Sequence, residues 1–157
     1  MPRQTDPDSF GFLVTDIARL MRAEMDRRIA DAGVGVTAGE ARALGQAARA
    51  GVVRQTVLAE RMGVEAMTLT AYLDRLEASG LIERRTDPTD RRAKLVHLTP
   101  AADAVLAQVQ TIGIALRAEV ARKIPPADWD RLQASLKIAR STLGDMRADS
   151  IRESSAA

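Results

Sequence analysis

The clearest candidate for chemistry in this sequence is a short run of basic side chains in the middle of the chain. Between residues 84 and 94, five basic residues stand against two aspartates, and the basic ones are Arg84, Arg85, Arg91, Arg92 and Lys94. Guanidinium and ammonium groups in such a cluster suit the phosphate oxygens of nucleic acid. Such a run is equally typical of an ordinary solvated surface, so the elements that carry it must decide between the two interpretations.

Cysteine and histidine, which often carry catalysis or bind metals, are nearly absent from the chain. The chain has no cysteine and one histidine, His97. These counts exclude disulfides, thiolate metal sites, cysteine nucleophiles and multi-histidine zinc sites. The carboxylates Asp16, Glu24 and Asp26 fall on the polar side of the first predicted helix, which is typical of a solvated face. We therefore expect no catalytic residue, no metal and no cofactor, and a protein that is not an enzyme.

Length and composition predict one ordinary soluble domain. The 157 residues are 46% hydrophobic and 28% charged, close to a globular average. The formal net charge is only +2, from 23 basic and 21 acidic residues, so the whole chain is not strongly basic. We find neither a run of 18 apolar residues nor a basic-then-apolar leader. No membrane span, no secretory signal and a cytoplasmic location are therefore expected.

The first third of the chain predicts two helices. Apolar side chains recur at three- and four-residue steps from Phe10 to Ile29, which predicts a helix of about six turns that Gly33 ends. Thr37 and Glu40 have the spacing of a capping box, in which the hydroxyl serves a backbone amide and the carboxylate reaches back. A second helix is therefore expected from residue 37 to about residue 51.

The middle of the chain changes its period. Short helices fit residues 55–62 and 65–79, with a tight turn at Gly63 between them. Residues 81–86 and 93–98 are β-branched or alternating and flank a segment rich in turn formers, so we expect a β-hairpin.

Two more helices are predicted at the end of the chain. Thr99 and Pro100 supply an N-cap and a first-turn proline for a helix that Pro125 and Pro126 end. A last helix fits residues 127–146, and the small polar residues from 149 to 157 are expected to fray.

This order of elements is typical of a winged helix-turn-helix. In that unit the second helix of the turn pair enters the DNA major groove, and the hairpin lies beside it on the backbone or minor groove. The basic run from 84 to 94 then falls on the hairpin. The predicted fold class is mainly α with a small β-hairpin wing, flanked by long N- and C-terminal helices.

The residues of this unit resemble the MarR family of bacterial winged helix-turn-helix transcription regulators. The resemblance covers nearly the whole chain, and it is carried by Leu58–Val64, Thr68, Thr70, Asp74–Glu77, Gly80–Ile82, Arg84, Asp90-Arg91-Arg92 and Leu98-Thr99. It implies a homodimer that binds a pseudo-palindromic double-stranded DNA operator, with the first and last helices in the dimerisation region. It also implies a pocket for a small aromatic or amphipathic ligand between the dimer helices and the DNA-binding lobe.

Four ranges describe the predicted organisation of one continuous domain. Residues 1–36 form an N-terminal arm and dimerisation helix, and residues 37–99 form the winged DNA-binding lobe. Residues 100–148 form the C-terminal dimerisation helices, and residues 149–157 a flexible tail.

The resemblance assigns DNA-binding roles to the hairpin. Arg92 matches the wing arginine of the family and is expected in the minor groove, where a guanidinium is more cheaply dehydrated than an ammonium. Asp90 is expected to support the wing without touching DNA. The remaining basic side chains are expected as phosphate contacts or solvated charges, and they are Arg84, Arg85, Arg91 and Lys94.

The helix over 65–79 carries the candidate base contacts. Thr68 and Thr70 offer short hydrogen-bonding groups, and Met67 and Ala71 could meet thymine methyls. Arg75 is predicted to contact phosphate or to pair with Asp74 or Glu77. Long polar donors are scarce, because alanines 66 and 71 stand where the family often has arginine. Arg54 is a further departure, since in the family a threonine or serine cap often begins the helix over 55–62 at this position.

The function predicted from these residues is sequence-specific DNA binding by a transcription regulator, a repressor released by a small-molecule effector. The alternative is a winged-helix protein-interaction module, an anti-regulator without direct DNA binding. The basic hairpin and the pair Asp90 and Arg92 favour the first interpretation.

Overall fold

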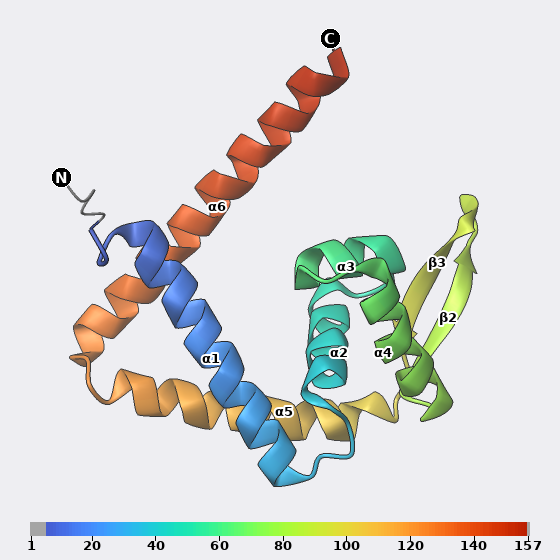
Figure 1. The fold of residues 1–157 in the computed structure, drawn as a ribbon, viewed down its shortest axis with the longest axis horizontal. Helices are drawn as coiled ribbons and strands as arrows, with labels where there is room; N and C mark the ends of the chain where they lie inside the picture. Colours follow the sequence, from blue (N-terminus) through green and yellow to red (C-terminus); the bar gives the residue numbers. More distant parts are fainter. Residues whose placement is uncertain (1–5, 157) are drawn as a thin grey trace, which may run out of the picture. The chain divides into compact units, whose positions relative to one another are not determined.

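A computed structural model describes residues 6–156, with side chains described through residue 154. Residues 1–5 of the predicted arm and residue 157 of the predicted tail lie outside the described residues. The chain divides into two compact units, one up to Leu116 and one from Arg117 onward. The elements, shown in Figure 1, are α1 (Phe10–Ala32), α2 (Ala38–Ala50), β1 (Val53–Arg54), α3 (Gln55–Met62), α4 (Ala66–Ala78), β2 (Ile82–Asp87), β3 (Asp90–Leu98), α5 (Ala102–Ala121) and α6 (Pro126–Ala156).

Local sequence signals set the ends of the first helices as predicted. Gly33 follows α1 with a left-handed φ of 61°, and Gly63 ends α3 with a φ of 63°. The capping box at the start of α2 is confirmed: the Glu40 amide donates to the Thr37 hydroxyl oxygen at 3.3 Å, and the Thr37 amide donates to the Glu40 carboxylate at 2.8 Å. These caps fix where α1 ends, where α2 begins and where α3 ends.

The hairpin is present, and it belongs to a three-stranded antiparallel sheet with the order β1-β3-β2. The third strand, β1, was not predicted from the sequence, because it has two residues and its partner is remote: Val53 pairs with Val96. Near the turn the register of the ladder shifts, since Thr86 pairs with Lys94 but the next residue, Asp87, pairs with Asp90. Residues 91–93 of β3 therefore lie in a bulge outside the ladder.

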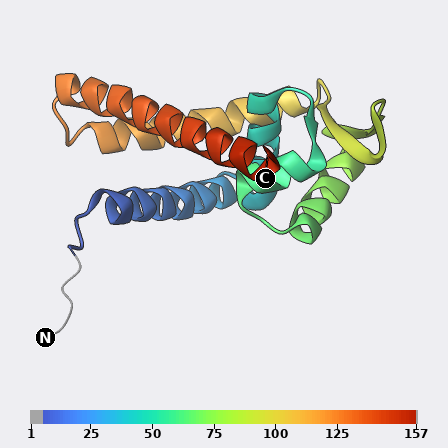
Figure 2. The same cartoon turned by 90° about the horizontal axis from the view of Figure 1, so that it is seen from above.

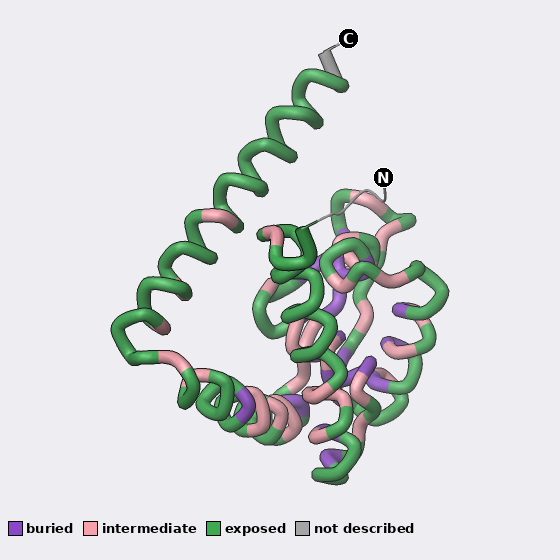
Figure 3. Tube along the Cα trace, turned by 60° about the vertical axis from the view of Figure 1, so that its left-hand side comes forward, coloured by how far each residue is buried: buried purple, intermediate pink, exposed green. Residues whose placement is uncertain are grey.

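The main core lies in the lobe formed by α2, α3, α4 and the sheet, where Figure 3 shows most of the buried positions. Its fully buried large side chains are Leu44, Leu58, Leu69, Leu73, Leu76, Ile82 and Val96. A second, smaller cluster joins α1 to α2 through Ile29, Val34 and Ala41. From this lobe, α1 extends to one side and the hairpin to the other (Figure 2). The core thus joins α4 to the base of the hairpin through Ile82 and Val96.

The start of α5 packs on both clusters. Ala102 is buried in the main core with Val105 and Leu106 against it, and Val109 and Ile112 pack on the smaller cluster. By length and composition α5 is one helix that could cross a membrane, with a mean hydropathy of 1.2 over an 18-residue window of which 6% is buried. Thr99 does not act as predicted, because its hydroxyl donates to the Gly80 carbonyl oxygen at 2.6 Å and α5 begins only at Ala102.

The last helix is longer than its predicted range. Instead of ending near Met146, α6 continues to Ala156, so the residues from 149 to 156 are helical where a frayed tail was expected. An ion pair between Arg152 and Asp149, one turn apart at 3.3 Å, lies in this extension. Among residues 126–154, none of the α6 side chains is buried.

Large apolar side chains remain exposed on both terminal helices. On α1 the exposed fraction is 61% for Phe10, 55% for Ile17 and 57% for Leu20. On α6 it is 60% for Leu143 and 63% for Met146. Rows of this kind are typical of surfaces that another chain covers.

Candidate nucleic-acid interface

One side of α4 is buried in the core, and the opposite side is exposed to solvent. Leu69, Leu73 and Leu76 point into the core and are at most 1% exposed. At the opposite side, Met67 is 84% exposed, and Thr68 and Ala71 are exposed as well. Three of the predicted base-contacting residues therefore share one accessible face of the helix.

Thr70 lies at the edge of that face, and its hydroxyl is already engaged. It donates to the Ala66 carbonyl oxygen at 2.9 Å and accepts a hydrogen bond from the Gln55 side-chain amide at 2.8 Å. The structure thus separates the two threonines: Thr68 is exposed, whereas Thr70 is half-buried and links α4 to the start of α3. Gln55 was not singled out in the sequence, because nothing local indicates a partner on the next helix.

Arg75 pairs with neither of the neighbours predicted for it. Its guanidinium donates to the carboxylate of Glu40 and lies over the ring of Tyr72, 5.7 Å from the ring centre. Glu40 is 5% exposed. Burial acts to raise the pKa of Glu40, but the hydrogen bonds from Arg75 and Thr37 outweigh it, and the pKa lies below its ordinary value. The capping box of α2 is therefore tied to α4 by an ion pair.

Arg84 joins the hairpin to α4. Its guanidinium lies 2.7 Å from an Asp74 oxygen and 2.6 Å from a Glu77 oxygen, and its backbone amide donates to Glu77 at 2.8 Å. Hydrogen bonds from Arg84 hold the pKa of Glu77 below its ordinary value. With 20% of its side chain exposed, Arg84 braces the fold, which leaves it little freedom to reach a phosphate.

The other basic side chains of the ladder are exposed and have nearby partners. Arg85 pairs with Glu83 at 2.7 Å, and the Lys94 ammonium donates to the Thr86 hydroxyl oxygen at 2.9 Å. Both contacts lie on the surface, where ion pairs and hydrogen bonds to water exchange at little cost. Either cation can therefore turn toward an external anion.

Arg91 and Arg92 project from the bulge of β3. Both are exposed. The Asp90 carboxylate accepts a hydrogen bond from the backbone amide of Arg92 at 3.0 Å. Asp90 therefore holds the main chain at the bulge through this hydrogen bond.

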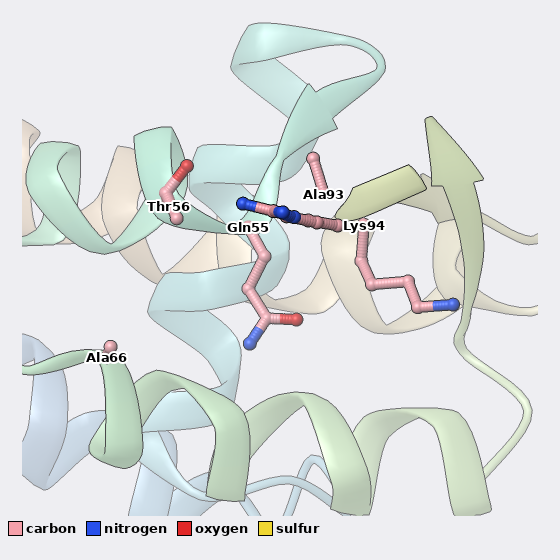
Figure 4. Close-up of a pocket in the computed structure, with 6 residues that line it drawn as sticks. Gln55, Thr56, Ala66, Ala93 and Lys94 are labelled. Carbon is pink, nitrogen blue, oxygen red and sulfur yellow. The ribbon is translucent and has the colours of Figure 1, made fainter. Parts of the chain in front are cut away.

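A hollow of about 180 Å³ brings the bulge next to the helix starts. It is lined by Gln55 and Thr56 at the start of α3, Ala66 at the start of α4, and Arg92, Ala93 and Lys94 of β3 (Figure 4). In Figure 4 the Gln55 side chain points from α3 toward α4. The N-terminal turn of α4 and the basic part of the hairpin are thus neighbours on one surface, which a single duplex could contact.

Two further hollows adjoin α1 and α2. One, of about 360 Å³, has Met21, Met25, Ile29, Ala41 and Val109 among its lining residues. The other, of about 740 Å³, lies between the α1–α2 connection and the end of α4, with Val34, Glu40 and Arg75 in its lining. Among the described residues, no group of three histidines or carboxylates is placed to hold a metal ion.

Comparisons with known proteins agree on one family. A family model described as the MarR family matches residues 36–94. The crystal structure of transcriptional regulator PA3341 is similar at 34% identity and a TM-score of 0.70, covering 87% of this chain and 99% of that one. A MarR family regulator from Silicibacter pomeroyi matches at 25% identity and a TM-score of 0.70, with 84% and 88% covered. Wild type MarR from E. coli in its apo form matches at 24% identity and a TM-score of 0.73, with 86% and 98% covered. These matches confirm the predicted winged-helix fold.

Proposed function

The chain belongs to the MarR family of transcription regulators, and from this premise we propose that it binds a specific double-stranded DNA operator and represses transcription there. Regulators of this family are non-enzymatic and bind DNA as dimers. The observation that carries the proposal is the shared surface at the 180 Å³ hollow, where the start of α4 adjoins Arg92 and Lys94. A helix for the major groove and a cation for the adjacent minor groove are then presented together.

Each protomer contacts DNA through two elements, α4 and the hairpin. The exposed face of α4 supplies Met67, Thr68 and Ala71 for base edges and thymine methyls. Arg92 enters the minor groove, and Arg91, Arg85 and Lys94 contact phosphates. Because the α4 side chains are short, specificity depends to a large extent on minor-groove width and DNA deformability.

The functional unit is a homodimer on a pseudo-palindromic operator. The exposed apolar rows of α1 and α6 support this, because a second copy would remove them from water. Sedimentation should give a dimer at micromolar concentration, and removal of residues 127–157 should abolish it. A monomer in the full-length chain, or a dimer that survives the truncation, would contradict this assembly. The cell compartment we propose is the cytoplasm.

A small aromatic or amphipathic molecule is proposed to release the repressor. The 740 Å³ hollow supports this, since it lies against both the α1–α2 connection and the end of α4. A ligand there would act through its different affinity for dimers with DNA-competent and incompetent spacings of the two α4 helices.

The experiment that tests the proposed function is footprinting on the DNA upstream of the chain's own coding region. We expect a protected palindromic site, bound in preference to a scrambled duplex of the same base composition at the same salt concentration. Equal affinity for both duplexes would refute sequence-specific binding. It would favour the winged-helix protein-interaction module instead.

A further inference from the structure

Arg54 directly precedes α3, but its side chain does not cap that helix. It is the N-cap residue of α3, with an extended backbone, yet its side chain makes no capping hydrogen bond to that helix. The guanidinium reaches the turn of the hairpin instead. Its Nε donates to the Asp87 carboxylate at 2.7 Å, and a terminal nitrogen donates to the Thr89 hydroxyl oxygen at 3.2 Å.

Asp87 is the centre of this contact. Its side chain is 7% exposed, so its charge is withdrawn from water at the end of an otherwise exposed hairpin. One carboxylate oxygen accepts the Thr89 backbone amide at 2.8 Å and the Thr89 hydroxyl at 2.7 Å, and the other accepts Arg54. A carboxylate buried in this way needs its cationic partner, because an unpaired buried charge is strongly unfavourable.

The contact lies where the ladder changes register. Asp87 pairs with Asp90, whereas its neighbour Thr86 pairs with Lys94, so the bulge of residues 91–93 starts directly beside this contact. No ladder pairing constrains these residues. The orientation of the bulge therefore depends on how the turn at residues 87–90 is held.

We propose that Arg54 is a positioning residue that fixes the hairpin turn against β1 and thereby sets where Arg91 and Arg92 project. The inference deepens the proposed function and rests on it. Arg54 acts through Asp87 and Thr89 and need not touch DNA. The wing is then held at two places: Arg84 ties its base to α4, and Arg54 ties its tip to the start of α3.

Threonine is the informative substitution at this position. Arg54→Thr removes the guanidinium but introduces a hydroxyl that can cap α3, and this cap offsets part of the stability lost when Asp87 loses its cationic partner. Arg54→Lys keeps the charge and loses the planar fork that serves Asp87 and Thr89 together. Arg49→Ala is the matched control, since it removes an exposed guanidinium from the last turn of α2, outside the hairpin and the terminal helices.

Two measurements on the full-length protein test the proposal. Hydrogen exchange followed by mass spectrometry reports on residues 87–93, and we expect Arg54→Thr to speed exchange there about tenfold or more. Binding to the footprinted operator at fixed salt should weaken about tenfold. Arg54→Lys should be intermediate in both measurements, and Arg49→Ala should match the unaltered protein.

The two measurements separate the possible failures. Unchanged exchange in Arg54→Thr would show that the guanidinium does not hold the turn and would overturn the proposal. Faster exchange with unchanged operator affinity would overturn the positioning role. If the unaltered protein has no preferred DNA site, the proposed function fails and with it the DNA part of this inference, while exchange still decides whether Arg54 holds the turn.

Discussion

Replacing Arg92 by alanine separates DNA binding from folding at this surface. Arg92 is exposed, lies in the bulge, and uses its backbone amide to donate to Asp90. Alanine keeps that amide, and no core side chain loses a neighbour. We therefore expect the free energy of unfolding to change by no more than about 0.5 kcal/mol.

The loss in DNA binding should be much larger. A dimer presents two wings, and each groove-inserted arginine contributes about 1–3 kcal/mol, which gives roughly 2–6 kcal/mol for both. This range corresponds to a weakening of about 30-fold to 10⁴-fold. Because two cations leave the interface, the slope of log K against log salt should become shallower by about 1.8.

Fluorescence anisotropy with the operator duplex at several salt concentrations measures both quantities, and circular dichroism with urea unfolding checks the fold. Arg92→Lys should restore only part of the affinity, because the ammonium holds its water more tightly. Asp90→Ala should give a milder defect than Arg92→Ala. If Arg92→Ala binds as tightly as the unaltered protein at fixed salt, the hairpin is not a DNA-binding element and the assignment of this surface is wrong.

Three further predictions concern α4 and its contacts. Thr68→Ala should cost about 1–3 kcal/mol of binding free energy on the preferred operator only. Thr70→Val should instead shift the melting temperature of the protein without changing its order of preference among operator sequences. Competition against single-base operator variants distinguishes the two results, and a changed sequence preference in Thr70→Val would contradict the engaged hydroxyl of Thr70. Gly39→Ala would place its Cβ 2.4 Å from the Cζ of Tyr72, and the overpacking cost of about 1–3 kcal/mol should exceed a helix-propensity gain of at most about 1 kcal/mol. Urea unfolding should show this loss and its recovery in Gly39→Ala/Tyr72→Leu, and an undiminished stability in Gly39→Ala alone would refute the close approach of α2 and α4. Since the pKa of Glu40 is lowered in the folded state, its stabilisation is complete above the ordinary value of 4.5 and is lost as the pH falls through the lowered one. Urea unfolding of Glu40→Gln should therefore depend less on pH in that acidic range, and parallel curves for the two proteins would contradict the ion pair with Arg75.

The sequence was most informative where the physical cause of a structure lies within a few residues. The capping box of Thr37 and Glu40 and the turn at Gly63 are such cases, because both partners of each interaction are close in the chain. The two-residue strand β1 is the opposite case. Val53 favours an extended backbone, but a run of two residues shows no strand pattern, and β1 forms because Val96 brings a partner from the hairpin.

The same distinction applies to the candidate site. The sequence assigned Met67, Thr68, Thr70 and Ala71 together to base contacts. In the structure Met67, Thr68 and Ala71 are exposed, whereas the Thr70 hydroxyl is engaged by Gln55. The sequence could not show which basic side chains are free to contact DNA, because ion pairs within the protein depend on tertiary neighbours. Arg84 is held by Asp74 and Glu77 at the foot of the hairpin.

Polar composition also gave a wrong expectation at the end of the chain. The small polar residues from 149 onward were expected to fray, yet residues 149–156 continue α6. Opposite charges one turn apart stabilise an exposed helix, and Asp149 and Arg152 form such a pair. Composition alone does not distinguish a solvated helix from a frayed end.

The division of α4 into a buried and an exposed side has a consequence for how new binding specificities can arise. Leu69, Leu73 and Leu76 hold the helix, while Met67, Thr68 and Ala71 make few contacts within the protein. Substitutions at the exposed positions should change stability by about 0.5 kcal/mol or less. Mutations that retarget this helix to another base sequence can therefore accumulate without a prior stabilising change. The same positions are the natural ones to randomise in a library selected for altered operators.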